Sequence, residues 1–424
     1  MNIHISGGRL IDPKSGIDAQ QDVFIVDKRI AAIGQVPEGF VAEQLIDARG
    51  LIVMPGLVDV AARLREPGYE YRATLESEMA AAVAGGVTSL SCPPDTDPPL
   101  DEPGLVEMLK HRARSLNQAR VFPVGALTYG LKGEQITEMA ELTEAGCKAF
   151  GHADAPPADN RVLMRAMQYA ATFGFRVWLR PQDAALSRNG VAHDGEVAAR
   201  LGLPPIPVVA ETVALSTMLQ LARETGVLLH VCRISSAAGV EMIRAAKREG
   251  LSVTCDVSMN HVHLTEVDIG YFDANCHLQP PLRTQRDRAA LRAGLADGTI
   301  DAICSNHSPV DDDAKLLPFA EAEAGATGME LLLPLVLKWA EQESVPLLDA
   351  LARVTINPAQ ALGVKVGHLS PGAHADVCIF DPQATWKVEP AALISQGKNT
   401  PFNGYTLQGR VRYTVVEGKT VFVA

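Results

Sequence analysis

Eight apolar runs of strand length recur through the middle of the 424-residue chain, and they constrain its fold more than any other feature. They cover residues 51–60, 88–92, 120–125, 148–151, 176–179, 227–231, 252–257 and 301–305. Most are separated by segments with the apolar period of a helix, at 74–84, 105–116, 161–172, 208–224, 240–249 and 285–295. Eight alternating strand and helix units predict an α/β fold, a (β/α)8 barrel of the TIM type.

Both ends of the chain show short alternating runs instead, which are typical of strands and hairpins. These runs lie at residues 3–5, 22–26 and 30–33, and again at 376–380, 411–416 and 420–423. We expect the two ends to meet in one small β-sandwich built from residues 1–52 and 365–424, with the barrel at 53–364. Two independent β appendages are the alternative.

The charge of the chain limits its possible partners, and its cysteine content indicates its compartment. The chain carries 38 basic and 50 acidic residues, a net charge of -12, which argues against nucleic acid or an anionic membrane as partner. No apolar run approaches the ~20 residues of a membrane-spanning helix. Seven scattered cysteines without a Cys-x-x-Cys pair indicate reduced thiols and a cytoplasmic location.

In a (β/α)8 barrel the chemistry sits at the carboxyl ends of the strands. The first strand ends in Pro-Gly-Leu-Val-Asp-Val-Ala61-Ala-Arg63-Leu-Arg65-Glu-Pro-Gly. This segment resembles dihydroorotase, the amidohydrolase that closes carbamoyl-aspartate to dihydroorotate, which has His-x-His where Ala61 and Arg63 stand. The resemblance places two zinc ligands there, and matches Arg65 to an arginine that binds the substrate carboxylate. Alanine offers no lone pair, and a guanidinium repels a dication.

The resemblance extends to the next strand ends over almost the whole chain. Asp95 replaces an asparagine that helps to hold the substrate, and it could equally be a turn residue beside proline. Asp154 matches a metal-bridging carboxylate, unless the match slips by one residue onto Ala153. Arg180 occupies a third ligand position, while His230 is the one clear ligand that is kept. We expect His230 to be a hydrogen-bonded histidine at the barrel mouth.

The last strand carries the substitution with the largest chemical consequence. Asn306 stands where the resemblance places an aspartate that is both metal ligand and general acid/base. A side-chain amide cannot take up or release a proton near neutral pH. Gln279 stands for a family asparagine, and His307 is kept, with a structural role.

Together these substitutions predict a chain that is not an enzyme, a pseudoenzyme of the dihydroorotase family without zinc or another cofactor. The vestigial catalytic positions are Ala61, Arg63, Asp154, Arg180, His230 and Asn306, and the vestigial substrate-binding positions are Arg65, Asp95 and Gln279. The resemblance then implies a non-catalytic partner of the aspartate carbamoyltransferase catalytic chain in pyrimidine biosynthesis, scaffolding a dodecameric hetero-oligomer.

Two other functions stay open. His261 and His263 form a His-x-His after the seventh strand and could join His230 in a relocated metal site of an active cyclic amidohydrolase. The arginines at 63, 65 and 180 could instead make a metal-free anion sensor. Alternatively, these arginines pair with Asp95 and Asp154 and fill the former metal cavity, which we expect.

Overall fold

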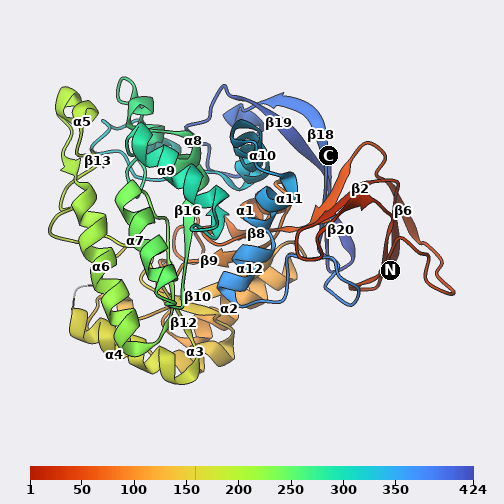
Figure 1. Cartoon of the computed structure of the whole chain (residues 1–424), viewed down its shortest axis with the longest axis horizontal. Helices are drawn as coiled ribbons and strands as arrows, with labels where there is room; N and C mark the ends of the chain where they lie inside the picture. The colour runs from red at the N-terminus through yellow and green to blue at the C-terminus, as the bar shows by residue number, and fades with distance from the viewer. Residues whose placement is uncertain (158) are drawn as a thin grey trace.

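The computed structural model describes residues 1–157 and 159–424, and its centre is a sheet of eight parallel strands that curves into a barrel (Figure 1). The strands, in chain and spatial order, are β8 (Leu57–Asp59), β9 (Val87–Cys92), β10 (Arg120–Ala126), β11 (Ala149–Gly151), β12 (Arg176–Leu179), β15 (Leu228–Val231), β16 (Val253–Ser258) and β17 (Ala302–Cys304). A parallel bridge between Ala62 and His307 joins the ends that follow β8 and β17. The predicted (β/α)8 barrel is confirmed.

Helices surround the barrel, and capping residues mark several of their ends. They are α1 (Leu75–Ala84), α2 (Pro103–Ser115), α3 (Met139–Ala145), α4 (Asn160–Phe173), α5 (Glu196–Leu201), α6 (Val208–Thr225), α7 (Ala237–Arg248), α8 (Met259–His263), α9 (Gln285–Ala296), α10 (Leu332–Glu343), α11 (Leu347–Ala352) and α12 (Ile356–Leu362). Thr284 and Asp287 form a capping box at the start of α9. Gly174 and Gly226 end α4 and α6 in the left-handed conformation.

The chain ends form two sheets beside the barrel, seen in red and dark blue in Figure 1. One has the order β20-β19-β18-β7-β2-β3, and the other has the order β5-β4-β1-β6. Their strands are β1 (Asn2–Ser6), β2 (Arg9–Asp12), β3 (Ile17–Gln20), β4 (Val23–Val26), β5 (Arg29–Ile33), β6 (Gln44–Asp47), β7 (Ile52–Pro55), β18 (Val377–Lys387), β19 (Thr406–Val416) and β20 (Lys419–Val423). Val53 of β7 pairs with Ile379 of β18, so both termini share one sheet and the alternative of separate appendages is wrong.

The expectation of a single strand over residues 51–60 is wrong, because the run divides between two sheets. β7 pairs with β2 and β18, whereas β8 pairs with β9 in the barrel. Gly56 lies between them, and a Cβ atom there would approach the Thr88 side chain to 2.1 Å. The close approach therefore requires glycine where the chain passes from the sandwich into the barrel. The domain boundary at residue 52 stays a prediction, and β7 extends across it.

Three further observations complete the description of the fold. All seven cysteines are free thiols. Across residues 1–157 and 159–424, no helix is both long enough and apolar enough to cross a membrane. The short strands β13 (Ala192–His193) and β14 (Pro205–Ile206) form a separate parallel pair next to α5.

Candidate functional site

Arg63 lies at the centre of a cluster of charged side chains at the mouth of the barrel. It follows β8, and its side chain is only 8% exposed. Nε donates to Asp95 Oδ2 at 2.8 Å, and Nη2 donates to Asp154 Oδ2 at 2.6 Å. Nη1 donates to Ser308 Oγ at 3.1 Å. Arg63 thus connects residues that follow the first, second, fourth and eighth strands of the barrel.

Asp154 collects two more guanidinium groups. Arg233 Nη2 donates to Asp154 Oδ1 at 2.6 Å, and Arg180 Nε lies 2.6 Å from the same oxygen. Arg180 Nη2 also donates to the Asp154 carbonyl oxygen at 3.1 Å. The expected pairing with Asp95 and Asp154 is confirmed for Arg63 and Arg180, with Arg233 as an additional member, but it is wrong for Arg65, which forms no salt bridge among the described residues. Asp154 itself makes these contacts, while its match to the metal-bridging position of the family stays a prediction.

The free space left at this centre is small. A cavity of about 30 Å³ remains beside Ala61 and Arg63, and Trp178 and Cys232 contribute to its wall. That volume is roughly enough for one water molecule. Three buried guanidinium groups therefore occupy most of the space between the strand ends.

Charge and burial act against each other in this cluster. Burial alone would raise the pKa of the Asp154 carboxyl, but Arg233, Arg63 and Arg180 together hold that pKa far below its ordinary value. Burial would likewise lower the pKa of Arg63, and the carboxylates of Asp95 and Asp154 raise it above its ordinary value. Each charge therefore depends on its neighbours, and removing one member leaves its partners buried without compensation.

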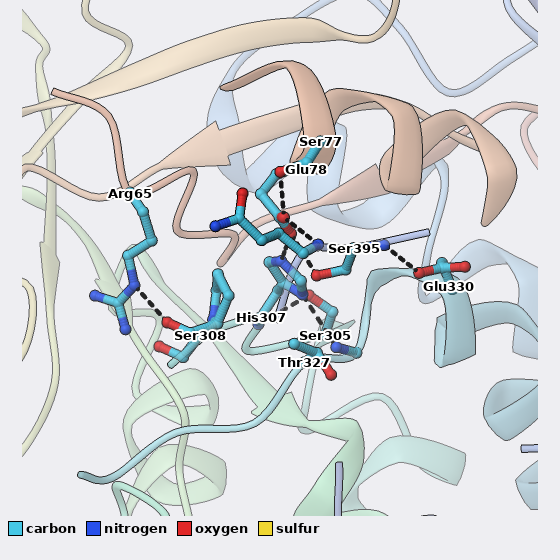
Figure 2. A network of polar contacts seen from close by, with 12 residues as sticks. Arg65, Ser77, Glu78, Ser305, His307, Ser308, Thr327, Glu330 and Ser395 are labelled. Atoms are coloured by element: carbon cyan, nitrogen blue, oxygen red, sulfur yellow. Dashed lines mark hydrogen bonds and ion pairs between the residues drawn. The ribbon is translucent and has the colours of Figure 1, made fainter. Parts of the chain in front are cut away.

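Arg65 lies at the edge of the same cluster, on the left of Figure 2. Its Nε donates to the carbonyl oxygen of Pro309 at 2.8 Å. Among the residues that the structure describes, no carboxylate forms a salt bridge with Arg65. Burial, together with the nearby Arg63, lowers the pKa of Arg65 to about 10. A carboxylate placed beside the Arg65 guanidinium would therefore stabilise its charge. This agrees with the expected role of Arg65 in binding a substrate carboxylate, and that role stays a prediction.

A second polar network, centred on His307 and Glu78, lies next to Arg65 (Figure 2). His307 Nδ1 accepts from Gly328 N at 3.1 Å, so Nε2 carries the proton and donates to Glu78 Oε2 at 2.5 Å. Ser395 Oγ also donates to Glu78 at 2.7 Å. Burial would raise the pKa of Glu78, but these hydrogen bonds hold it below its ordinary value. His307 fixes α1 and the loop at Ser395 against the end of β17, a structural role as expected.

His230 on β15, Cys232 directly after it and Asp256 on β16 form another cluster. His230 Nε2 lies 2.8 Å from Asp256 Oδ2, and Nδ1 lies 2.8 Å from Thr254 Oγ1. One ligand atom from each of the three residues lies within 4.8 Å of the others. The Cys232 thiol has a pKa well above its ordinary value, because it is buried and close to Asp256. His230 is hydrogen-bonded, as expected, but it is also part of a possible metal site.

The remaining predicted positions contribute little chemistry. Asn306 Oδ1 accepts from Arg233 Nη1 at 3.0 Å, and Asn306 Nδ2 donates to the Gln279 carbonyl oxygen at 3.3 Å. Gln279 is thus held through its backbone. Ala61 is buried, and its carbonyl oxygen accepts from His307 N at 3.1 Å.

These residues decide whether a pair of zinc ions could bind at the strand ends, where the resemblance to dihydroorotase places the ligand positions. Ala61 offers no ligand atom, and Asp154, the carboxylate placed between the metals, is already paired with three guanidinium groups. The strand ends therefore do not fit a binuclear centre. The group of His230, Cys232 and Asp256 does fit a single ion, because imidazole, thiolate and carboxylate are all ligands of zinc.

The proposed relocation through His261 and His263 is not supported by the structure. Both residues lie in the short helix α8 rather than on a strand, and residues two apart on a helix point away from each other. His261 Nε2 lies 3.1 Å from the Pro281 carbonyl oxygen, and His263 Nε2 lies 2.8 Å from that of Leu335. Burial lowers the pKa of His261 to about 4 and that of His263 to about 3.

Sequence reasoning missed Arg233, Asp256 and Glu78. Asp256 lies inside β16, where we expected only core residues, and Glu78 lies in the middle of α1. A signal existed for Asp256 and Glu78, because charged residues within otherwise apolar strands or helix faces are rarely buried without a partner. Arg233 follows β15 by two residues and was visible at a strand end.

Comparison with known proteins places these features in a family. A family model described as dihydro-orotase-like matches residues 50–238, and one described as an amidohydrolase family matches 319–422. A dihydroorotase-like protein of Pseudomonas putida is 47% identical over 418 residues, covering 99% of this chain and 98% of the relative. A dihydroorotase of Geobacter sp. (strain M21) is 41% identical and covers 100% of both chains. L-hydantoinase from Arthrobacter aurescens has a TM-score of 0.88 at 26% identity, covering 100% of this chain and 97% of that structure.

These relatives overturn two expectations. The expectation that the chain is not an enzyme is contradicted by relatives named dihydroorotase at 41% identity over the full length. The expectation that it holds no metal is contradicted too, since amidohydrolases of this kind are typically metal-dependent and a group able to hold an ion is present. Both errors share one cause. The loss of ligands at the strand ends was taken to remove every metal site, although possible ligands remain in β15, directly after it and in β16.

Proposed function

We propose that this chain, which belongs to the dihydroorotase-like amidohydrolase family, catalyses the opening or closure of a cyclic amide with one metal ion at β15 and β16. The observation that carries the proposal is the convergence of His230, Cys232 and Asp256 in a full-length relative of dihydroorotases. Three protein ligands with a free fourth position are typical of catalytic zinc sites. The strand-end positions at which the resemblance places metal ligands take no part in holding this ion; they are Ala61, Arg63, Arg180 and Asn306.

The residues around this cluster fit an acidic substrate. Cys232 lies in the wall of the small cavity, next to Arg63 and Arg233, so the metal would face the arginine cluster. When bound, the ion would supply a Lewis acid for the amide carbonyl. Arg65, which is paired only with a backbone carbonyl oxygen, would bind a substrate carboxylate and fix its orientation.

Substrate binding requires movement at the mouth of the barrel. The cavity of about 30 Å³ is far smaller than a cyclic amide, so Arg63 must leave Asp154 or Asp95 before a substrate can enter. A dianionic substrate could replace these two carboxylates as the partner of the guanidinium groups. The positive charge that the arginines keep in excess favours such an exchange.

Metal content and turnover test this proposal together. The purified protein should contain close to one equivalent of zinc or a similar ion by mass spectrometry, and should interconvert dihydroorotate and carbamoyl-aspartate. Cys232→Ser should lose both the metal and the activity. Cys255→Ser is the matched control, because Cys255 is a buried cysteine on the neighbouring strand that lies outside the metal group. Protein without bound metal and without turnover of dihydroorotate, hydantoin or dihydrouracil would refute the proposal.

A second function is association with the aspartate carbamoyltransferase catalytic chain, in a dodecameric hetero-oligomer. Five apolar side chains are exposed on the loops that follow β16 and β17, and they support a protein partner. These are Val267, Tyr271, Phe272, Leu316 and Leu317. Tyr271 is 91% exposed and Leu316 is 82% exposed. Lys315 Nζ donates to the Ala274 carbonyl oxygen at 2.8 Å and so joins the two loops.

Light scattering of this chain mixed with the carbamoyltransferase chain of the same organism tests the association. We expect one co-eluting complex of several hundred kilodaltons, weakened when Tyr271→Ser and Leu316→Ser are combined. Val41→Ser is the control, because Val41 is 73% exposed but lies in the N-terminal region, away from these loops. Two separate peaks at micromolar concentration would refute the association.

A further inference from the structure

A cavity of about 630 Å³ lies at the end of the barrel opposite the arginine cluster. Its wall includes Arg120, the first residue of β10, and Lys148, which precedes β11. Helix α2 contributes Lys110 and Arg114. The segment from α2 to β10 adds Gln118, and the sandwich adds residues at the turns before β5 and β20. The cavity therefore lies where the barrel and the sandwich meet, far from the strand ends that form the mouth.

The charges around this cavity are strongly unbalanced. Six cationic side chains line it, together with a single carboxylate, that of Glu417; the cations are Lys28, Lys110, Arg114, Arg120, Lys148 and Lys419. Glu417 is already paired, with Lys28 at 2.8 Å and Arg120 at 3.3 Å. Arg120 also pairs with Asp376, at 2.8 Å. Among the salt bridges of the described residues, none includes the other four cations. This concentration of positive charge is unexpected in a chain with a net charge of -12.

The Lys110 ammonium is held in place within this cluster. Nζ donates to the Ala145 carbonyl oxygen at 3.0 Å. Burial lowers the pKa of Lys110, and the neighbouring charges of Arg114 and Lys148 lower it further, against the opposing effect of Glu107. A Cβ atom at Gly146 would lie 1.7 Å from Nζ, so the glycine leaves the space that the ammonium occupies. The fold thus holds like charges close together, and a bound anion would offset the electrostatic repulsion between them.

Gln118 provides an additional polar group in the same wall. Its side-chain Oε1 is buried and has no hydrogen-bond partner within residues 1–157 and 159–424. A buried amide without a partner is costly, and a ligand with donors and acceptors would relieve that cost. The cavity therefore offers charged donors on one side and a neutral polar group on another.

We propose that this cavity binds a small anion with two or more phosphate charges, such as a nucleoside triphosphate or inorganic pyrophosphate. Guanidinium and ammonium groups together are the usual partners of phosphate oxygens. The volume falls within the range of ligand pockets and suits a molecule of nucleotide size. Because the site joins the barrel to the sandwich, the anion would stabilise the contact between them. The site is independent of the chemistry at the mouth.

Calorimetric titration of the full-length protein with pyrophosphate and with ATP tests the proposal. We expect saturable binding that weakens as salt is raised, because the partners are charged and largely exposed. Arg114→Ala and Lys148→Ala should each weaken binding about tenfold, equivalent to about 1.4 kcal/mol. Arg248→Ala is the matched control, because Arg248 is an exposed arginine at the end of α7 and does not line the cavity.

Two further comparisons identify the ligand chemistry and the site. Full competition between pyrophosphate and ATP would support recognition of the phosphates alone, and tighter binding of ATP would support a nucleotide ligand. Arg65→Gln, at the opposite end of the barrel, should leave the binding unchanged. Absence of binding at millimolar concentration would overturn the proposal. So would binding that survives Lys148→Ala combined with Arg114→Ala, or that is lost in Arg65→Gln.

Discussion

The replacement Asp154→Asn tests how the mouth of the barrel is held together. Asp154 is the shared partner of Arg63, Arg180 and Arg233, each about 2.6 Å away. These three side chains are only 8%, 3% and 5% exposed. Asparagine keeps the shape of the side chain and one acceptor oxygen, but it removes the negative charge. Three buried cations would then face one another with only Asp95 as a counter-charge.

The expected loss of stability follows from the burial of the cluster. Breaking a buried ion pair by removing one partner costs about 3–5 kcal/mol. The Asp154 side chain is 26% exposed, so solvent screens part of that loss and about 2–4 kcal/mol is the better value. The unfolding entropy is about 2.1 cal/mol/K per residue, or about 0.9 kcal/mol/K for the whole chain. The melting temperature should therefore fall by about 2–4 °C.

Differential scanning calorimetry of the two proteins provides the measurement. Asp97→Asn is the matched control, because Asp97 is an exposed aspartate in the loop after β9, two residues from Asp95, and forms no ion pair in the described part of the chain. The melting temperature of this variant should stay unchanged. Added sulfate should restore much of the lost stability in Asp154→Asn, since an anion can replace the carboxylate between the arginines. An equal melting temperature in wild type and Asp154→Asn, or no specific effect of sulfate, would refute the reasoning.

Two further predictions concern groups that are buried in a single protonation state. Glu78→Gln should destabilise the protein by roughly 2–3 kcal/mol, because His307 and Ser395 lose a charged acceptor. Glu76→Gln, at an exposed position of the same helix, is the control and should leave the stability unchanged. Equal denaturation midpoints for the two variants would contradict the prediction. Stability should also decrease from pH 7 to pH 5. Burial lowers the pKa of four histidines, so below about pH 6.5 the unfolded chain binds protons more readily than the folded chain. Each histidine should then lower the free energy of unfolding at pH 5 by on the order of 1–2 kcal/mol. Their pKa values are about 4 for His152, His261 and His277 and about 3 for His263. A denaturation midpoint that is the same or higher at pH 5 would disprove this assignment.

Local patterns in the sequence were sufficient for the architecture. The eight apolar runs and the helical periods between them correspond to the barrel, and Thr284 with Asp287 marked the start of α9 correctly. The passage from β7 to β8 was missed, because an apolar run of ten residues gives no sign that it is divided at Gly56 between two sheets. Hydrophobic periodicity reports which face of an element is buried, and not which sheet the element joins.

For the candidate site, the sequence by itself determined which residue types stand at the strand ends. It showed arginines where metal ligands were expected, and pairing with Asp95 and Asp154 followed from charge alone. Only the tertiary structure decided that Arg233 joins them, that His307 is fixed by Glu78, and that the possible metal group combines β15 with β16. The basic cavity between α2 and the sandwich was also invisible in the sequence. The physical reason is that charges and ligand atoms act over a few ångströms in space, and residues on different strands and helices reach that distance only after the chain has folded.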